Sequence, residues 1–99
     1  MTIRVGKKWD KDAQYIGRGS PLGNPFFMAD ESQRDKVCDQ YQVWFEAKIA
    51  AKDPAVMQEL ERLHSLAQQG DLILGCYCAP KRCHGETIKA YLDCFFNWR

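Results

Sequence analysis

Three cysteines and a histidine stand within nine residues of one another near the end of the chain: Cys76, Cys78, Cys83 and His84. Thiols are soft metal ligands and nucleophiles, and an imidazole transfers protons near neutral pH. A short apolar run, residues 72–74, precedes the group, and an amphipathic segment follows it. The sequence therefore predicts a reactive turn between a strand and a helix. We call residues 76–86 the cysteine turn.

One hypothesis for the cysteine turn is a metal site. Side chains two apart on a strand point the same way, so Cys76 and Cys78 would converge, and Cys83 and His84 would approach from the far side. Four such ligands suit zinc, and three thiolates suit an iron–sulfur cluster. The spacing differs from the Cys-x2–4-Cys pairs of structural zinc sites. A metal-binding structural or interaction module is therefore kept as an alternative.

A second hypothesis is an enzyme with a cysteine nucleophile. A thiol at the N-terminus of a helix, beside basic side chains, is more readily ionised than a free thiol. Cys83 is flanked by Lys81, Arg82 and His84. In this hypothesis Cys83, His84 and Glu86 are the catalytic residues.

The third hypothesis is binding of an anion without covalent chemistry, and it demands least of the sequence. The N–H groups of Gly85, Glu86 and Thr87 are expected to be unpaired at the helix start, where they attract negative charge. Arg82 and His84 would add donors to a phosphate or a base edge. Glu86 would then serve as a general base or as an acceptor for a ribose hydroxyl.

A second motif, GRGSPLGNPF at residues 17–26, has three glycines and two prolines in ten residues. We call it the glycine loop. Glycine permits close approach of the backbone to a ligand, and proline restricts the residue before it, so a rigid and shaped loop is expected. It predicts a phosphate or sugar cradle, and an ordered tight turn is the alternative interpretation. The cradle would be formed by Arg18, Gly19, Ser20 and Asn24.

Length and composition predict one domain spanning residues 1–99, since 99 residues cannot support two cores. No apolar run approaches the ~18 residues of a membrane span, and the start lacks the pattern of a secretory signal. Five cysteines is an odd number, which argues against a disulfide framework. We expect a cytoplasmic protein with no membrane partner, in the host cytoplasm if a phage encodes it.

Charge is unevenly distributed along the chain. Residues 1–22 carry five basic and two acidic side chains, residues 30–71 five basic and nine acidic, and residues 72–99 four basic and two acidic. If both ends meet at the site, it is electropositive on an otherwise acidic molecule, which favours an anionic ligand.

Hydrophobic spacing predicts elements in the order β-β-α-α-β-α. The strands are expected at residues 2–5, 13–16 and 72–76, with the last in the middle of the sheet, and the helices at residues 30–51, 54–69 and from 85 onwards. Cys38 and Cys94 are expected to pack inside helical faces. The fold class is α/β, a single small domain with helices packed on a short central sheet and a Rossmann-like arrangement at most.

The two motifs, with the helical middle containing Tyr41 and Trp44, resemble the phage and bacterial family called domain of unknown function 4326. The resemblance covers nearly the whole chain and implies no activity. At Glu86 the family often has aspartate instead. The residues of the two motifs that match the family pattern are Gly17, Arg18, Gly23, Asn24, Pro25, Phe26, Cys76, Cys78, Pro80, Cys83, His84 and Gly85.

The leading hypothesis is that both loops form one pocket that binds a nucleotide-like or nucleic-acid phosphate ligand, and whether the protein also processes this ligand is left open. The expected partner is an anionic small molecule or a nucleic acid. Its binding residues would be Arg18, Gly19, Ser20, Asn24, Arg82 and Gly85. Zinc or an iron–sulfur cluster is the cofactor only under the metal hypothesis.

Overall fold

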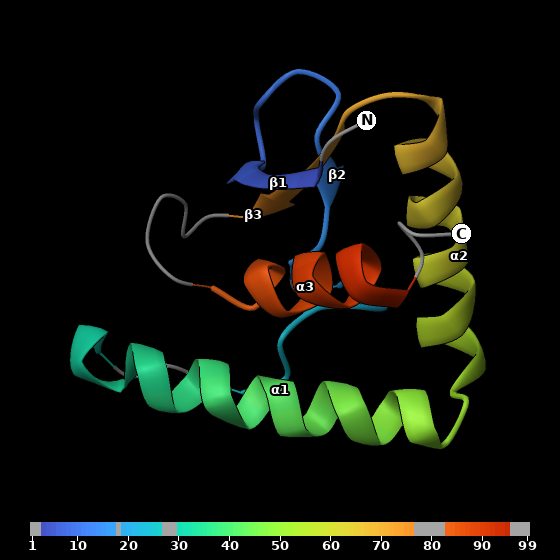
Figure 1. The fold of residues 1–99 in the computed structure, drawn as a ribbon. Helices are drawn as coiled ribbons and strands as arrows, with labels where there is room; N and C mark the ends of the chain where they lie inside the picture. The colour runs from blue at the N-terminus through green and yellow to red at the C-terminus, as the bar shows by residue number, and fades with distance from the viewer. Residues whose placement is uncertain (1–2, 18, 27–29, 77–82, 96–99) are drawn as a thin grey trace.

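Three short parallel strands form the sheet in the computed structural model of the chain (Figure 1). The structure describes residues 3–17, 19–26, 30–76 and 83–95. The strands are β1 (Ile3–Lys7), β2 (Gln14–Tyr15) and β3 (Leu72–Cys76), in the spatial order β1-β3-β2. β3 therefore lies in the middle of the sheet, as its apolar sequence predicts. Leu72, Leu74 and Cys76 alternate along β3 and share one face, and all three are buried, whereas Ile73 on the other face is half-buried.

The helical elements are a short 3-10 helix, η1 (Glu31–Gln33), followed by α1 (Arg34–Ala50), α2 (Pro54–Gln69) and α3 (Gly85–Phe95). Two aspartates cap the N-termini of η1 and α2, because their side chains accept hydrogen bonds from backbone N–H groups. The Asp30 carboxylate accepts from Ser32 N at 2.8 Å, and that of Asp53 accepts from Val56 N at 3.1 Å. The observed order confirms the predicted β-β-α-α-β-α arrangement and the mixed α/β class.

Figure 1 shows α3 lying between the sheet and α1, with α2 standing at one end of these layers. The core runs through all of them. It includes Ile3 from β1, Tyr41 and Phe45 from α1, Leu60 and Leu63 from α2, Leu74 from β3, and Ile88 and Leu92 from α3. α3 is thus covered on two sides, which fixes the position of the cysteine turn that leads into it.

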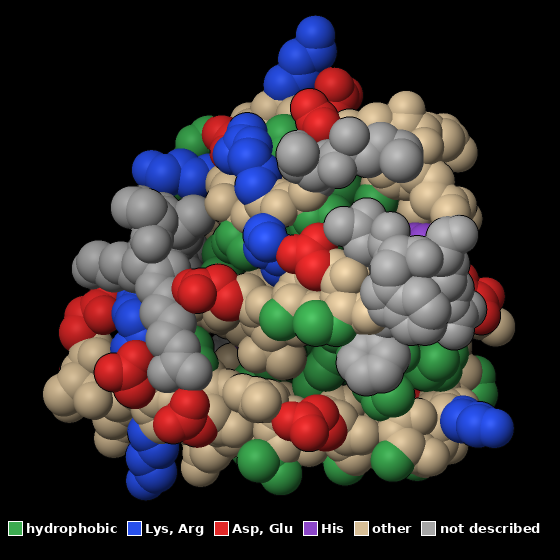
Figure 2. Space-filling model, in the orientation of Figure 1, with side chains coloured by type: hydrophobic (Ala, Val, Ile, Leu, Met, Phe, Trp, Pro, Cys, Tyr) green, Lys and Arg blue, Asp and Glu red, His purple; other side chains and the backbone are tan. Residues whose placement is uncertain are grey.

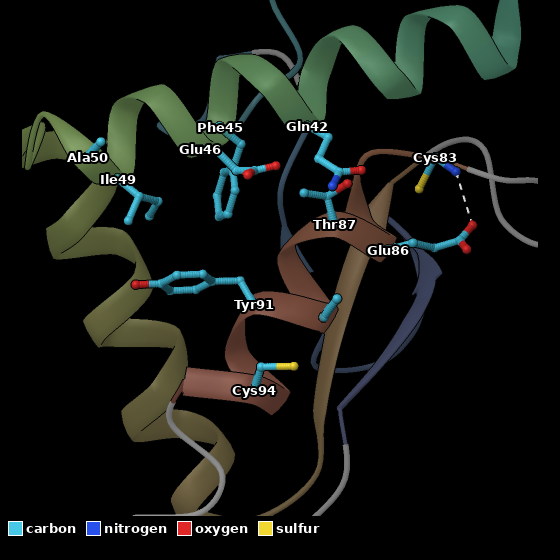
Figure 3. Close-up of a pocket in the computed structure, with 11 residues that line it drawn as sticks. Gln42, Phe45, Glu46, Ile49, Ala50, Cys83, Glu86, Thr87, Tyr91 and Cys94 are labelled. Carbon is cyan, nitrogen blue, oxygen red and sulfur yellow. Dashed lines mark hydrogen bonds between the residues drawn. The ribbon is translucent and has the colours of Figure 1, made fainter.

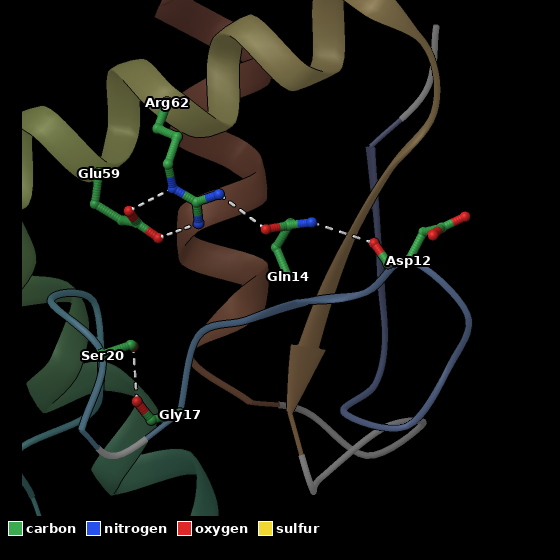
Figure 4. Close-up of polar contacts among 6 residues, drawn as sticks. All are labelled: Asp12, Gln14, Gly17, Ser20, Glu59 and Arg62. Carbon is green, nitrogen blue, oxygen red and sulfur yellow. Dashed lines mark hydrogen bonds and ion pairs between the residues drawn. The ribbon is translucent and has the colours of Figure 1, made fainter.

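Arg62 connects α2 to β2 on the surface (Figure 4). Its guanidinium donates to Glu59 Oε1 and Oε2 at 2.8 and 2.6 Å and to Gln14 Oε1 at 2.9 Å. Because the group is exposed, this contact contributes little stability, but it orients the two-residue strand β2 against the helix.

Gly85 allows the start of α3 to approach the sheet closely. A Cβ at this position would lie 2.9 Å from Ile16 Cδ1 and 3.1 Å from Val5 Cγ1, which is too close for a relaxed contact. A larger residue would push the first turn of α3 away from β1.

Some expectations differ from the structure. β1 extends to Lys7, two residues beyond its predicted end, β2 is shorter than predicted, and the first predicted helix is divided into η1 and α1. The prediction that Cys94 is a packing residue is wrong, because this thiol is exposed, whereas Cys38 is buried as expected. Among the described helices, none is long and apolar enough to cross a membrane.

Candidate functional site

The carboxyl ends of the three strands meet at one edge of the sheet. Lys7 pairs with Cys76, and Tyr15 pairs with Gly75. Beyond the strands, Lys8 N donates to Cys76 O and Ile16 N donates to Gly75 O, both at 3.0 Å. The glycine loop and the cysteine turn therefore leave the sheet side by side, at the edge where α/β domains commonly bind ligands.

His84 connects the two loops. Its Nε2 lies 2.6 Å from the carbonyl oxygen of Ile16, directly before the glycine loop, and the side chain is buried. A carbonyl oxygen only accepts, so Nε2 carries the hydrogen, and Nδ1 is the acceptor of the neutral ring. Burial lowers the pKa of His84 below its ordinary value, and the bond to Ile16 partly opposes this shift. The imidazole is therefore neutral at pH 7.

Tyr41 of α1 packs on the same histidine and also contacts the glycine loop at Leu22. Its hydroxyl donates to Leu22 O at 2.8 Å, and its ring lies edge-on to that of His84, with centroids 4.9 Å apart. Burial, and secondly the charge of Cys83, raise the pKa of Tyr41, so the phenol stays protonated. The sequence indicated a core role for Tyr41. The contact with the glycine loop could have been anticipated, because the hydroxyl of a tyrosine inside an apolar helical face needs a hydrogen-bond partner.

Two thiols of the cysteine turn lie in contact with each other. Cys76 Sγ and Cys83 Sγ are 3.0 Å apart, and both side chains are buried. The backbone N–H of Gly85 donates to Cys83 Sγ at 3.3 Å. This donor and the positive end of α3 both favour the thiolate form of Cys83, whereas the burial of the side chain opposes it. Cys78 and Arg82, predicted as metal ligand and phosphate donor, lie outside the described residues.

The first turn of α3 satisfies its own N–H groups, so the prediction that they are unpaired is wrong. Glu86 N donates to Cys83 O, and Thr87 N donates to His84 O, both at 3.1 Å, while Gly85 N is bonded to the Cys83 thiol. The Glu86 side chain accepts from Cys83 N at 3.3 Å. These contacts form a capping box with cysteine in the place of serine or threonine, and an anion would reach these N–H groups only by replacing a bond.

Within the glycine loop, the polar side chains stabilise the loop itself. Ser20 Oγ donates to Gly17 O at 2.7 Å (Figure 4), and Asn24 Oδ1 accepts from Phe26 N at 2.8 Å. Two successive turns, Gly17 to Ser20 and Ser20 to Gly23, shape the backbone, and Gly19 has a φ of 91° that favours glycine. The loop is therefore preorganised. Arg18, its predicted phosphate donor, lies outside the described residues.

A pocket of about 600 Å³ lies between α1 and α3 and reaches the cysteine turn (Figure 3). Its α1 side is lined by Gln42, Phe45, Glu46, Ile49 and Ala50. Its other side is lined by Cys83, Glu86, Thr87, Ala90, Tyr91 and Cys94. Of the predicted site residues, Cys83 and Glu86 belong to it. The α1 residues were not predicted as site residues, because their part in a pocket depends on how two helices pack.

Among the described residues, no three histidine, cysteine, aspartate or glutamate side chains are grouped to hold a metal ion. Cys76 and Cys83 are two adjacent soft ligands, but His84 Nε2 is used by Ile16 O. A metal at the cysteine turn would therefore draw on these two thiols, on His84 Nδ1, or on Cys78.

The fold and the site together define a small parallel α/β domain with a thiol–imidazole turn at the carboxyl edge of its sheet. The chain belongs to the family DUF4326, domain of unknown function 4326, whose family model matches residues 2–94. The match confirms the resemblance carried by the two motifs. No curated protein and no solved structure matches the chain.

Proposed function

We propose that the protein binds, and processes, a phosphate-bearing ligand, nucleotide-like or part of a nucleic acid, at the carboxyl edge of the sheet. The observation that carries this proposal is the contact of His84 with Ile16 O, which brings the starts of the glycine loop and of α3 together. A preorganised glycine-rich loop beside the positive end of a helix is a common arrangement for binding phosphate.

Basic residues support the same proposal. Lys7 and Lys8 stand at the end of β1, next to Cys76, and Arg18 and Arg82 are next in the chain to Gly17 and Cys83. With the first-turn N–H groups of α3 already bonded, side chains rather than backbone must supply most donors to a phosphate. Arginine suits this role because its planar guanidinium donates two parallel hydrogen bonds to phosphate oxygens.

Chemistry on the ligand would use the cysteine turn. The neutral His84 ring has an acceptor at Nδ1, and Cys83 is held beside an N–H donor that stabilises its thiolate. These groups suit proton transfer and nucleophilic attack, respectively.

The test is a binding screen with inorganic phosphate, the four ribonucleoside 5′-monophosphates and a short single-stranded DNA, read by thermal shift and calorimetry. Arg18→Ala removes a charge-assisted contact of ~1.5–3 kcal/mol and should weaken binding by about ten- to a hundredfold. Arg62→Ala is the matched control, because this exposed arginine lies on α2. The proposal fails if no probe binds, or if both variants change binding equally.

The contact between Cys76 Sγ and Cys83 Sγ favours a second candidate function, a metal-stabilised structural or interaction module. Elemental analysis of protein purified without a tag tests it. About one zinc ion, or an iron–sulfur chromophore, in each chain would support this function, and a metal-free folded chain would exclude it. Under the metal hypothesis Cys83→Ser lowers stability by several kcal/mol, while Arg18→Ala has little effect.

A further inference from the structure

The pocket between α1 and α3 continues from the cysteine turn and has a different chemistry from it. Phe45 and Tyr91 point towards each other from the two helices, with ring centroids 5.5 Å apart and planes at 83° (Figure 3). Phe45 is buried and Tyr91 is half-buried, so the tyrosine ring offers the accessible aromatic surface. Such a surface stacks on flat ligands, and nucleobases are flat and aromatic.

The charge of the pocket determines how a phosphate-bearing ligand could lie in it. Among the residues that the structure describes, its lining includes the carboxylates of Glu46 and Glu86 but no lysine or arginine. Figure 2 shows further acidic side chains on the surface over α1. A phosphate inside the pocket would be repelled, whereas a neutral group with hydrogen-bond donors would be attracted. The pocket therefore favours a ligand whose phosphate remains outside, on the side of the cysteine turn.

The polar side chains on the α1 side match the donors of a nucleoside. Gln42 and Glu46 line the pocket from α1, and Thr87 lines it from α3 (Figure 3). A carboxylate accepts from ribose hydroxyls and from the amino groups of bases, and an amide can both donate and accept. The volume of about 600 Å³ falls within the ~300–1,000 Å³ typical of small-molecule sites.

We propose that this pocket holds the nucleoside part of the ligand, so that the substrate class of the site is a ribonucleoside phosphate. The inference rests on the proposed function, because it places the phosphate at the cysteine turn and the glycine loop. The base lies against Tyr91, and the ribose hydroxyls and base amino groups donate to Glu46. Cys83 and Glu86 border both parts of the ligand.

The experiment separates the two parts of the ligand by calorimetry with three kinds of probe: the four ribonucleosides, their 5′-monophosphates and inorganic phosphate. Glu46→Gln should weaken the binding of the preferred nucleoside and of its monophosphate by the same factor, about tenfold, and leave inorganic phosphate unchanged. Glu61→Gln, an exposed carboxylate on α2, is the matched control and should change none of the three. The 2′-deoxynucleotide should bind more weakly than the ribonucleotide.

A second variant fills the pocket without removing a charge. Ala90 lies on the exposed side of α3 and lines the pocket, and leucine is also a good helix former, so Ala90→Leu should fold. It should abolish nucleoside binding and spare inorganic phosphate. Arg18→Ala should do the opposite, weakening inorganic phosphate and sparing the nucleoside.

These outcomes distinguish failure of the inference from failure of the proposed function. The inference is overturned if no nucleoside binds, or if Glu46→Gln and Ala90→Leu leave the monophosphate unaffected. The proposed function fails separately if inorganic phosphate and the monophosphates bind no better to the wild-type chain than to Arg18→Ala.

Discussion

His84 Nε2 and the carbonyl oxygen of Ile16 lie 2.6 Å apart, although 68 residues separate them in the chain. This hydrogen bond joins the turn before α3 to the end of β2 and buries an imidazole at the carboxyl edge of the sheet. The same side chain therefore stabilises the fold and shapes the candidate site.

The first prediction is that His84→Asn destabilises the protein more than His84→Gln. The glutamine amide nitrogen can occupy the position of Nε2 and donate to Ile16 O, whereas the shorter asparagine leaves this buried carbonyl unpaired. We expect a loss of about 2–4 kcal/mol for asparagine and less for glutamine, measured by urea unfolding. Equal losses for the two variants would show that ring packing, rather than the hydrogen bond, is what matters.

The second prediction concerns pH. Burial lowers the pKa of His84 below its ordinary value of 6.5, so the folded chain takes up a proton less readily than the unfolded chain. Stability should be at its full value above pH 6.5 and fall as the pH drops from 6.5 through the folded-state pKa. His84→Gln should flatten this part of the curve of unfolding free energy against pH. An unchanged slope in that variant would assign the titration to groups other than His84.

The third prediction uses two glycines. Gly85→Ala places a Cβ 2.9 Å from Ile16 Cδ1 and should cost about 1–3 kcal/mol by displacing the start of α3. Gly70→Ala is the matched control, since a Cβ there meets nothing within 4 Å and the backbone is extended, with a φ of 170°. It should be neutral or stabilise by up to about 1 kcal/mol. Comparable losses in both variants would contradict the close packing of α3 on β1.

These glycines also illustrate what the sequence could predict. Gly70 marks the end of α2, and the Asp53–Pro54 pair marks its start, so local signals were sufficient for that helix. β3 was predicted to be central because it is short and apolar between polar residues. Such signals depend on neighbours in the chain, and the structure confirms the elements that they define.

The site depended on contacts that no local pattern encodes. Tyr41 finds Leu22 O and His84 only in the folded chain, and the first-turn N–H groups of α3 find partners in a tight turn that could not be foreseen. The α1–α3 pocket likewise requires two helices that are more than thirty residues apart. The sequence predicted the glycine loop, the cysteine turn and Glu86 as parts of one site, but it did not predict Glu46 of α1 as a lining residue.

The fourth prediction is that a nucleoside protects Cys94 from alkylation. Cys94 is exposed and lines the pocket, whereas Cys38, Cys76 and Cys83 are buried. In a Cys78→Ser background, iodoacetamide should label Cys94 first, as read by peptide mass spectrometry. Addition of the preferred nucleoside should slow this labelling, and inorganic phosphate should not. Labelling that is insensitive to every nucleoside would contradict occupation of this pocket.

The fifth prediction is that Tyr41→Phe loosens the glycine loop without unfolding the domain. The change removes the donor to Leu22 O and leaves that buried carbonyl unpaired, at a cost of about 1–3 kcal/mol, while the ring can still pack on His84. Hydrogen exchange should quicken at Ser20 N and Gly23 N, which form the two turns of the loop, and stay unchanged at the amides of α2. Because the loop is then less preorganised, binding of inorganic phosphate should weaken as well. Faster exchange throughout the chain would instead show that Tyr41 stabilises the whole core, and unchanged exchange in the loop would show that its turns hold without α1.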